Sequence, residues 1–321
     1  MQLMIYGGLK KMVMKMNKHI KIGSRDSQLA LWQTYHVIDA LKEHFPDTTF
    51  EVVSMKTKGD KLLDISLSKI GDKGLFTSEL ESMMISGEID LAVHSLKDMP
   101  TSLDSRLVLA CFLKRYNHKD ALLTKHTGGI MDLPHGAVVG TSSLRRRSQL
   151  LSMRPDLEVC DLRGNINTRL KKFHEGHYDA AILAVAGLDR LGFHDEISEE
   201  LDEEFFMPAV GQGVLTIECR SDREDLLDMI STINHHDTYM CITAEREFMN
   251  SLNGGCQVPL GAYAQIIDDT IKIQGFVGSV DGTEIIKEEI IRPVSEFQSI
   301  GKLLADKLLS KGAKKILDAI R

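Results

Sequence analysis

A short apolar strand that runs directly into a cluster of polar side chains places the tightest constraint on the fold of this chain. In the stretch Ile89–Pro100 (IDLAVHSLKDMP), Ile89, Leu91 and Val93 alternate as in a β-strand. Polar residues follow within a few positions, and Pro100 prevents a helix from continuing. Open α/β sheets place ligands just past the carboxyl ends of their strands. The stretch therefore predicts such a sheet, with a binding site at this edge.

Asp98, within this polar cluster, is the candidate catalytic residue. A carboxylate held at a strand end can stabilise a developing cation or shuttle a proton. The alternative is that Asp98 only forms a turn, since aspartate is among the common turn residues. This stretch by itself leaves both interpretations open.

The same order of strand, polar loop and helix opens the chain. Ile20–Ile22 is a short strand pattern, residues 23–27 are polar, and apolar residues then recur at helical spacing as far as Phe45. Free backbone N–H groups at such a helix start attract anions, and Arg25 adds a planar charged group suited to carboxylates. The competing interpretation makes Ser27 a helix N-cap and Arg25 a solvated charge.

A third strand end carries a run of arginines. The strand pattern 137–140 leads into the hydroxyl residues 141–143 and then into Arg145, Arg146 and Arg147. Arginine in the first turns of a helix opposes the helix dipole, and a bound anion would remove that conflict. A nucleic-acid patch is disfavoured because the chain has a net charge of -7. We favour carboxylate or phosphate binding over a solvated helix face.

The connection between the second strand and the next helix is unusually long. Lys58–Gly74 is polar and irregular, and a connection of this length inside a compact domain is often a lid or a binding loop. Ser78 and Glu81 fit a capping box for the helix that follows, and Gly87 fits its C-cap.

Cys256 lies in the turn Gly254–Pro259, between two glycines and a proline. A free cysteine commonly packs as a small hydrophobic residue, but this turn suits a reactive or modified thiol better. The chain has five cysteines and no CxxC pair, so neither a zinc ribbon nor a disulfide framework is indicated, and we expect no metal site. Free thiols fit a reducing cytoplasm.

The later part of the chain predicts a return to the first sheet and a small final domain. The strand pattern Val214–Cys219 follows a turn-rich crossover, and Glu196–Glu204 before it is an acidic surface segment. Three antiparallel strands and one amphipathic helix are expected at Gly261–Ile267, Thr270–Gly278, Glu284–Arg292 and Val294–Leu309.

These patterns define an α/β protein with two doubly wound lobes and a small C-terminal α+β domain. A chain of 321 residues allows two or three domains, and 43% apolar with 26% charged residues indicates a soluble globular protein. No apolar run reaches membrane-spanning length, and the first residues indicate a disordered extension, or a start codon assigned too early, rather than a signal peptide. The expected divisions are 1–17 as the extension, 18–113 with 214–232 as the first domain, 119–207 as the second, and 236–321 as the third.

Eight motifs occur in order from about residue 20 to the C-terminus: GSRDSQLALWQ, KGLF, AVHSLKDMP, GTSSLRRR, LRGNINTRL, AVAGLDRL, PAVGQG and NGGCQVPLG. Together they closely resemble the porphobilinogen deaminase (hydroxymethylbilane synthase) family, and so many motifs in register are a specific signal. The resemblance implies two lobes like those of periplasmic binding proteins. It also implies a transferase that joins four porphobilinogen molecules head to tail into 1-hydroxymethylbilane and releases ammonia at each addition.

The resemblance assigns a role to each polar motif residue. Asp98 matches the catalytic carboxylate, and Cys256 matches the cysteine that carries a thioether-linked dipyrromethane cofactor. The other matches are cofactor contacts at Ser95, Lys97, Thr141, Ser142, Ser143, Arg145, Arg146, Arg169 and Gly187, substrate contacts at Arg25, Ser27, Gln33, Arg163 and Arg169, and a loop over the active site with Lys69, Lys73 and Phe76. Each pyrrole carries an acetate and a propionate, which explains the need for arginines. Arg147 is left as a surface charge.

Two other functions compete with this assignment. A two-lobed binding module for a carboxylate-rich ligand would share the lobes and the arginines, but it would have no use for the Cys256 turn. A nucleic-acid regulator would read phosphates through Arg145–Arg147, and its function would depend on salt. We expect a cytoplasmic monomer in haem biosynthesis that acts on porphobilinogen, with no nucleic-acid or membrane partner.

Overall fold

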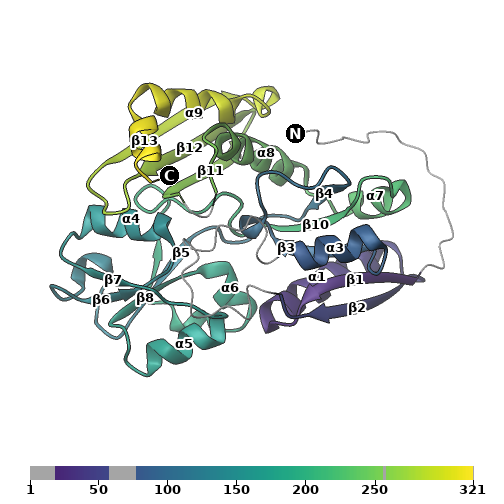
Figure 1. Cartoon of the computed structure of the whole chain (residues 1–321), viewed down its shortest axis with the longest axis horizontal. Coiled ribbons are helices and arrows are strands. Elements are labelled where there is room, and N and C mark those ends of the chain that lie inside the picture. The colour runs from purple at the N-terminus through teal and green to yellow at the C-terminus, as the bar shows by residue number, and fades with distance from the viewer. Residues whose placement is uncertain (1–18, 58–76, 256–257, 321) are drawn as a thin grey trace. The chain divides into compact units, whose positions relative to one another are not determined.

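The computed structural model describes residues 19–57, 77–255 and 258–320 (Figure 1). This part of the chain forms two compact units. The first contains residues 19–57, 77–114 and 214–239, and the second contains residues 115–213 and 240–320. The first unit holds one five-stranded sheet, and the second holds a five-stranded and a three-stranded sheet.

The sheet of the first unit has the strand order β2-β1-β3-β10-β4. Its elements are β1 (His19–Arg25), α1 (Gln28–His44), β2 (Thr49–Met55), α3 (Ser78–Ser86), β3 (Leu91–Ser95), the 3-10 turn η2 (Leu96–Asp98), β4 (Leu107–Phe112), β10 (Leu215–Arg220) and α7 (Glu224–Ser231). β1 is parallel to β2 and β3, whereas β10 is antiparallel to β3 and β4. The predicted late strand that returns to the first sheet is therefore confirmed as β10.

Alternation along β3 explains why helices cover both faces of this sheet. Leu91 and Val93 are buried in a core that includes Val37 and Leu41 of α1 and residues of α7. Ala92 faces the opposite side and belongs to a second core with residues of α3. A strand that is apolar on both faces is typical of a doubly wound sheet.

The ends of α3 differ in part from the prediction. Thr77, not Ser78, is the N-cap residue and makes no capping hydrogen bond with its side chain. The Ser78 hydroxyl lies 3.1 Å from a Glu79 carboxylate oxygen, so the predicted capping box is wrong. Gly87 does end the helix, with a φ of 81° that favours glycine.

The five-stranded sheet of the second unit repeats the topology of the first, with the order β7-β6-β8-β5-β9. Its elements are β5 (Asp120–Thr124), η3 (Ile130–Asp132), β6 (Val138–Gly140), α4 (Leu144–Met153), β7 (Glu158–Cys160), α5 (Ile166–His174), β8 (Ala180–Ala184), α6 (Val185–Arg190), η4 (His194–Glu196) and β9 (Glu199–Leu201). β6 is parallel to β7 and β8, and β5 is antiparallel to β8 and β9. The acidic segment expected only as surface therefore contains an edge strand, β9.

The three-stranded sheet carries the C-terminal core. β11 (Leu260–Ile267), β12 (Thr270–Gly278) and β13 (Ile285–Pro293) pair antiparallel, as predicted. They pack against α8 (His236–Ser251), α9 (Ile300–Ser310) and α10 (Ala313–Asp318). The single predicted helix over 294–309 is wrong: η5 (Val294–Glu296) is a separate turn, and Phe297 packs on the core before α9 begins.

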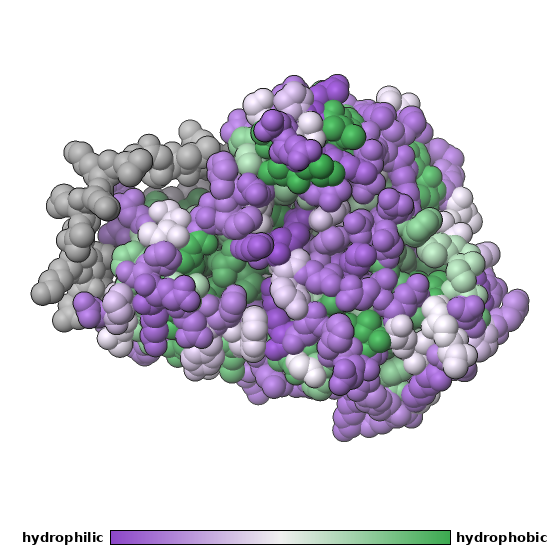
Figure 2. All heavy atoms as spheres, turned by 180° about the vertical axis from the view of Figure 1, so that it is seen from behind, coloured by the Kyte–Doolittle hydropathy of each residue, from purple (hydrophilic) through white to green (hydrophobic). Residues whose placement is uncertain are grey.

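The fold is thus mixed α/β, with two doubly wound lobes and a smaller C-terminal domain that has its own sheet. The predicted limits of three domains remain a prediction. None of the helices in the described part of the chain combines the length and the apolar character that crossing a bilayer requires. The face of the molecule in Figure 2 is largely hydrophilic, with hydrophobic residues scattered over it.

Two segments of the second unit, at residues 115–119 and 211–213, run against each other, and each adjoins in sequence a point where the chain passes to or from the first unit. The backbone N–H of Tyr116 donates to the Gly213 carbonyl over 3.1 Å. Gly213 has a φ of 85°, and a Cβ there would lie 2.8 Å from the Asn117 carbonyl oxygen. Glycine is therefore required at this position both by backbone conformation and by space.

A buried carboxylate of α8 fastens both segments to the C-terminal sheet. This residue is Glu245, which is fully buried. Its Oε1 accepts a hydrogen bond from the Ala264 N–H and lies 2.8 Å from Arg115 Nη2. Its Oε2 accepts a hydrogen bond from the Gly211 N–H. A buried charge with this many partners ties three elements of the second unit together.

We predict that Gly213→Ala destabilises the protein more than Gly192→Ala does. Both glycines have positive φ, at 85° and 75°, but a Cβ at Gly192 would meet nothing within 4 Å. Gly192→Ala should cost only the left-handed backbone penalty of about 1–2 kcal/mol, and Gly213→Ala should cost more through its backbone clash. Urea unfolding of both variants measures the difference, and equal losses would show that the close approach at Gly213 is unimportant.

Candidate active site

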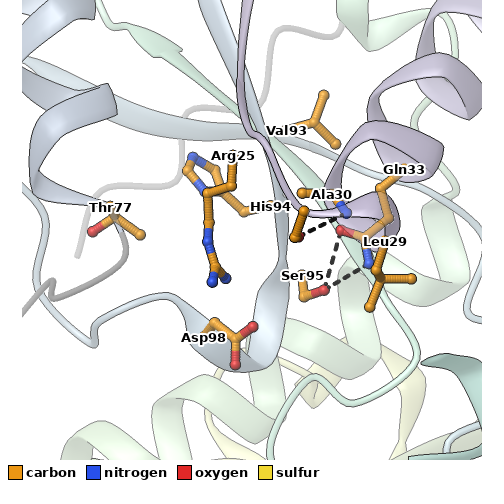
Figure 3. A pocket seen from close by; sticks show the side chains of 10 residues that line it. Arg25, Leu29, Ala30, Gln33, Thr77, Val93, His94, Ser95 and Asp98 are labelled. Carbon is orange, nitrogen blue, oxygen red and sulfur yellow. Dashed lines mark hydrogen bonds between the residues drawn. The ribbon is translucent and has the colours of Figure 1, made fainter. Parts of the chain in front are cut away.

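A pocket of about 70 Å³ lies at the carboxyl ends of β1 and β3 in the first unit (Figure 3). These strands are parallel neighbours, so both end at the same edge of the sheet. The pocket is lined by Arg25, Ser27, Leu29, Ala30, Gln33, Thr77, Val93, His94, Ser95 and Asp98. The structure thus brings together five of the predicted site residues at the predicted edge: Arg25, Ser27, Gln33, Ser95 and Asp98.

The side chain of Asp98 is exposed, and buried residues on both sides anchor the turn that carries it. It ends the 3-10 turn η2, in which Leu96 is 1% exposed, and Met99, which follows, is 3% exposed. The Leu96 N–H donates to the Val214 carbonyl, and the Met99 N–H donates to the Leu96 carbonyl. Asp98 is therefore a turn residue and a pocket residue at once. In Figure 3 the Arg25 side chain extends toward its carboxylate.

A buried glutamine fixes the opposite side of the pocket. Gln33 of α1 is 3% exposed, and its Nε2 donates to the Ser95 hydroxyl over 2.9 Å. The Ser27 hydroxyl accepts from the Ala30 N–H, which confirms Ser27 as the N-cap of α1. Lys97 lies half-buried on η2 and does not line the pocket.

In the second unit, the predicted cofactor residues gather at the carboxyl ends of β6, β7 and β8. These strands run parallel, so Thr141–Ser143 after β6, Arg163 after β7 and Gly187 in α6 all follow the same edge of the sheet. Ser143 is the N-cap of α4 and accepts from the Arg146 N–H. The arrangement corresponds to the pocket edge of the first lobe.

Two of the arginines expected to bind an anion are paired with a carboxylate of the protein. Arg145 Nη1 lies 2.7 Å from Asp120 Oδ2, and Arg146 Nη2 lies 2.7 Å from Asp120 Oδ1. All three side chains are buried. Burial alone would raise the pKa of Asp120, but the two guanidinium groups hold it well below its usual range. Burial lowers the pKa of Arg145, and Asp120 opposes that effect.

The same carboxylate is bound by the PAVGQG segment. Gln212 Nε2 donates to Asp120 Oδ1 over 2.9 Å, and Arg145 Nη1 also donates to the Met207 carbonyl. Gly261 of β11 lies against this cluster, because a Cβ there would be 3.2 Å from Arg145 Cδ. Sequence reasoning missed Asp120 and Gln212, whose only signal was a charged residue at the start of an apolar strand and a glutamine between two glycines.

Several polar atoms near the predicted cofactor residues have no partner. Within the described ranges, Ser142 Oγ and Arg163 Nη1 are buried and accept or donate no hydrogen bond. Arg169 Nε donates to the Gly164 carbonyl and so braces the loop that holds Arg163. Arg147, expected as a surface charge, is half-buried and donates to the Val159 carbonyl. Unpaired buried donors of this kind fit a carboxylate-bearing group.

Four predicted residues lie outside the described part of the chain. They are the cofactor cysteine Cys256 and the loop residues Lys69, Lys73 and Phe76.

The fold and these sites define a protein with two doubly wound α/β lobes and a smaller C-terminal domain that has its own sheet. Residues 20–228 match the family model "Porphobilinogen deaminase, dipyromethane cofactor binding domain", and residues 239–310 match "Porphobilinogen deaminase, C-terminal domain". The chain belongs to the porphobilinogen deaminase family, as its motifs predicted.

Curated relatives agree over nearly the whole chain. The porphobilinogen deaminase of Chlorobaculum parvum is 50% identical over 309 residues, which cover 95% of this chain and 99% of the relative. That of Desulforamulus reducens is 47% identical over 306 residues, with the same coverage of both chains. Among solved structures, the methionine-binding protein MetQ is 12% identical with a TM-score of 0.44, and the likeness covers 69% of this chain and 92% of that one.

We predict that Asp120→Asn lowers the free energy of unfolding by about 3–5 kcal/mol at neutral pH, because it leaves two buried arginines without a counter-charge. The pKa of Asp120 is lower in the folded protein, so its contribution is present above the unfolded pKa of about 4 and is lost as the pH falls. The variant should therefore lose less stability on acidification than the wild type.

Denaturant unfolding at several pH values measures both effects. Asp306→Asn is the control, since its carboxylate pairs with Lys302 on the surface, where such a pair contributes little to stability. Equal stability of the two variants would contradict the importance of the Asp120 cluster.

Proposed function

We propose that this protein joins four porphobilinogen molecules head to tail into 1-hydroxymethylbilane and releases ammonia at each addition. The observation that carries the proposal is the match of both family domains, in order, over residues 20–228 and 239–310. Relatives that carry the name porphobilinogen deaminase are 47–50% identical over 95% of the chain.

We propose that dipyrromethane is attached through a thioether to Cys256. When bound, it supplies the pyrrole position to which each new unit is added. Its acetate and propionate groups need hydrogen-bond donors and cations. The unpaired Ser142 Oγ and Arg163 Nη1, both at one edge of the second lobe, fit that need. Arg145, Arg146 and Arg169 would add positive charge, although Asp120 already neutralises part of it.

In the first lobe, the proposed substrate contacts are Arg25, Ser27 and Gln33. The Arg25 guanidinium suits a substrate carboxylate because it offers several donors in a planar arrangement. Gln33 is held by Ser95 and is therefore already ordered before any ligand arrives.

Asp98 is the proposed catalytic residue. Positive charge develops on the substrate pyrrole when its ammonia leaves, and a carboxylate beside the ring stabilises that charge. The position of Asp98 on a turn anchored by Leu96 and Met99 supports this role, because the carboxylate is fixed without being buried. A fixed charge needs little reorganisation when the reaction occurs.

The finer assignments are part of the same proposal. We propose a monomer in the cytoplasm that serves haem biosynthesis, with Lys69, Lys73 and Phe76 in a loop over the active site. The five cysteines without a CxxC pair favour a reducing compartment, and the net charge of -7 disfavours a nucleic-acid partner.

We predict that the intact mass of the purified protein exceeds the sequence mass by one dipyrromethane unit, and that peptide mapping places the excess at Cys256. Cys256→Ser should show the sequence mass alone. A wild-type protein that stays unmodified after incubation with porphobilinogen or preformed 1-hydroxymethylbilane would refute the enzyme and favour a bare binding module.

We predict that Asp98→Ala folds normally but loses about 100-fold or more in the rate of porphobilinogen consumption, as expected when a charge-stabilising group is removed. Asp104→Ala is the matched control, because Asp104 lies in the following loop and pairs with Arg106 on the surface. Its rate should equal that of the wild type. Wild-type activity in Asp98→Ala would remove the proposed catalytic role.

A further inference from the structure

The C-terminal sheet meets helix α4 of the second lobe through two glycines, and all of these elements belong to the second unit (Figure 1). A Cβ at Gly278, the last residue of β12, would overlap the hydroxyl oxygen of Ser148. A Cβ at Gly282, in the turn before β13, would lie 2.5 Å from the backbone nitrogen of Ser152. Ser148 and Ser152 are four residues apart on α4 and therefore share one face of the helix. The backbone of the sheet thus packs directly on that face.

Space alone requires glycine at position 278. Gly282 has a φ of 73°, which favours glycine in any surroundings, whereas Gly278 lies outside the left-handed region. After the Ser148 oxygen, the nearest atom to a Cβ at Gly278 is Ile285 Cγ1, at 3.3 Å. Ser148 is fully buried, and among the described residues its Oγ has no hydrogen-bond partner. A single oxygen atom that makes no hydrogen bond therefore decides whether alanine fits at position 278.

Gly278 is also bonded to the chain that leaves the turn of Cys256. The Gly278 N–H donates to the Pro259 carbonyl over 2.9 Å. Pro259 ends that turn and lies three residues after Cys256 in the sequence. β11 begins at the next residue, Leu260, and pairs with β12 along its whole length. A displacement of Gly278 therefore acts on the end of the turn that carries the cysteine.

The helix on the other side of Gly278 carries proposed cofactor contacts at its start. Ser143 is the N-cap of α4, and Arg145 and Arg146 lie in its first turn. Ser148 follows Arg145 by three residues, so the two lie on the same side of the helix. Gly278 is thus a contact between the end of the cysteine turn and the helix that holds these arginines.

The separation of these two elements matters if one group is held by both. A group that is attached covalently at one place and bound through its carboxylates at another gains from the attachment only when the two places are correctly spaced. A misplacement of about 1 Å can cost about 100-fold in rate. Because a close-packed interior accommodates an extra methyl group only by shifting its neighbours, a Cβ at this contact would change the spacing.

We propose that Gly278, packed against Ser148, is a positioning residue that sets the spacing between the turn of Cys256 and the start of α4. The inference deepens the proposed function and rests on it, because it requires a cofactor that is held at both places. Gly278 acts through the two elements that it joins. A glycine with only a structural role would lower stability when replaced, but the folded protein would still take up the cofactor at the normal rate.

The test uses a pair of substitutions that first create and then relieve the overlap. Gly278→Ala adds the Cβ, and Ser148→Ala removes the oxygen that this Cβ would meet, at no loss of a hydrogen bond. The double variant Gly278→Ala/Ser148→Ala should therefore regain the normal spacing. Leu308→Ala is the control for lost stability, because Leu308 is fully buried in the C-terminal core but lies on α9. Each protein is first checked for cooperative unfolding.

The first readout is the rate at which the apo-protein, produced without porphobilinogen, gains the dipyrromethane mass after preformed 1-hydroxymethylbilane is added. We expect Gly278→Ala to be slower than wild type by about tenfold. Ser148→Ala, the double variant and Leu308→Ala should stay close to the wild-type rate. If Gly278→Ala gains the mass as fast as Leu308→Ala, or if Ser148→Ala does not restore its rate, the proposal is overturned.

The second readout is the stability that the bound cofactor adds, which does not depend on turnover. In each background, the urea midpoint of the loaded protein is compared with that of the same protein carrying Cys256→Ser. We expect the difference between the two midpoints to be smaller in Gly278→Ala than in wild type, and unchanged in Leu308→Ala and in the double variant. Equal differences in all backgrounds would show that the glycine is only structural and would overturn the proposal.

Two further outcomes are kept apart by the design. If Gly278→Ala does not unfold cooperatively, Ser148→Val takes its place, because it crowds the same contact from the helix, and the same slow uptake is expected. If wild type itself gains no mass at Cys256, the proposed function fails and this inference fails with it. If wild type gains the mass and the crowded variant gains it equally fast, only the positioning role fails.

Discussion

The second lobe depends on one buried carboxylate. Asp120 is the first residue of β5. Its carboxylate pairs with Arg145 and Arg146 and accepts a hydrogen bond from Gln212. A buried charge that loses its partner is strongly destabilising, and two guanidinium groups lie against this one. Because these partners lie on α4 and on the PAVGQG segment, the Asp120 carboxylate also holds both of them against β5. Gly261 of the C-terminal sheet packs closely on this cluster, since a Cβ there would lie 3.2 Å from Arg145 Cδ.

The two lobes share a strand order, but they differ in whether the charged side chains at the equivalent sheet edge face solvent or pair with one another. In the first lobe, Arg25 and Asp98 remain on a solvent-facing pocket at the ends of β1 and β3. In the second lobe, the equivalent edge has its strongest charges neutralised internally, and it presents hydroxyl groups together with Arg163. Parallel strands bring such residues to one edge in both cases. Topology therefore places the groups, and in the second lobe the pairing with Asp120 neutralises part of the charge of two of them.

Local sequence signals predicted the local structure well. Ser27 and Gly87 cap their helices because capping depends on the residue itself, and the alternation around Leu91 marked a strand with two buried faces. The failures are of two kinds. β9 was missed because three residues in an acidic segment form a strand only through pairing with β5. The break before α9 was missed because the apolar spacing continues through it: Phe297 packs on the same core as α9 although it lies outside that helix.

The arginine run shows where reasoning from the chain alone stops. Arginines in the first turn of α4 oppose the helix dipole, and the structure pairs two of them with a carboxylate of the protein; the predicted binding of an external anion remains a prediction. The identity of that carboxylate was out of reach, since Asp120 is far away in sequence and ordinary in its local context. Motif order supplied the family but not this pair. The motifs and the structure together are more informative than either alone. Asp120 already neutralises part of the charge of Arg145 and Arg146. A carboxylate-rich ligand at this edge would therefore meet reduced positive charge there, beside the unpaired Ser142 Oγ and Arg163 Nη1.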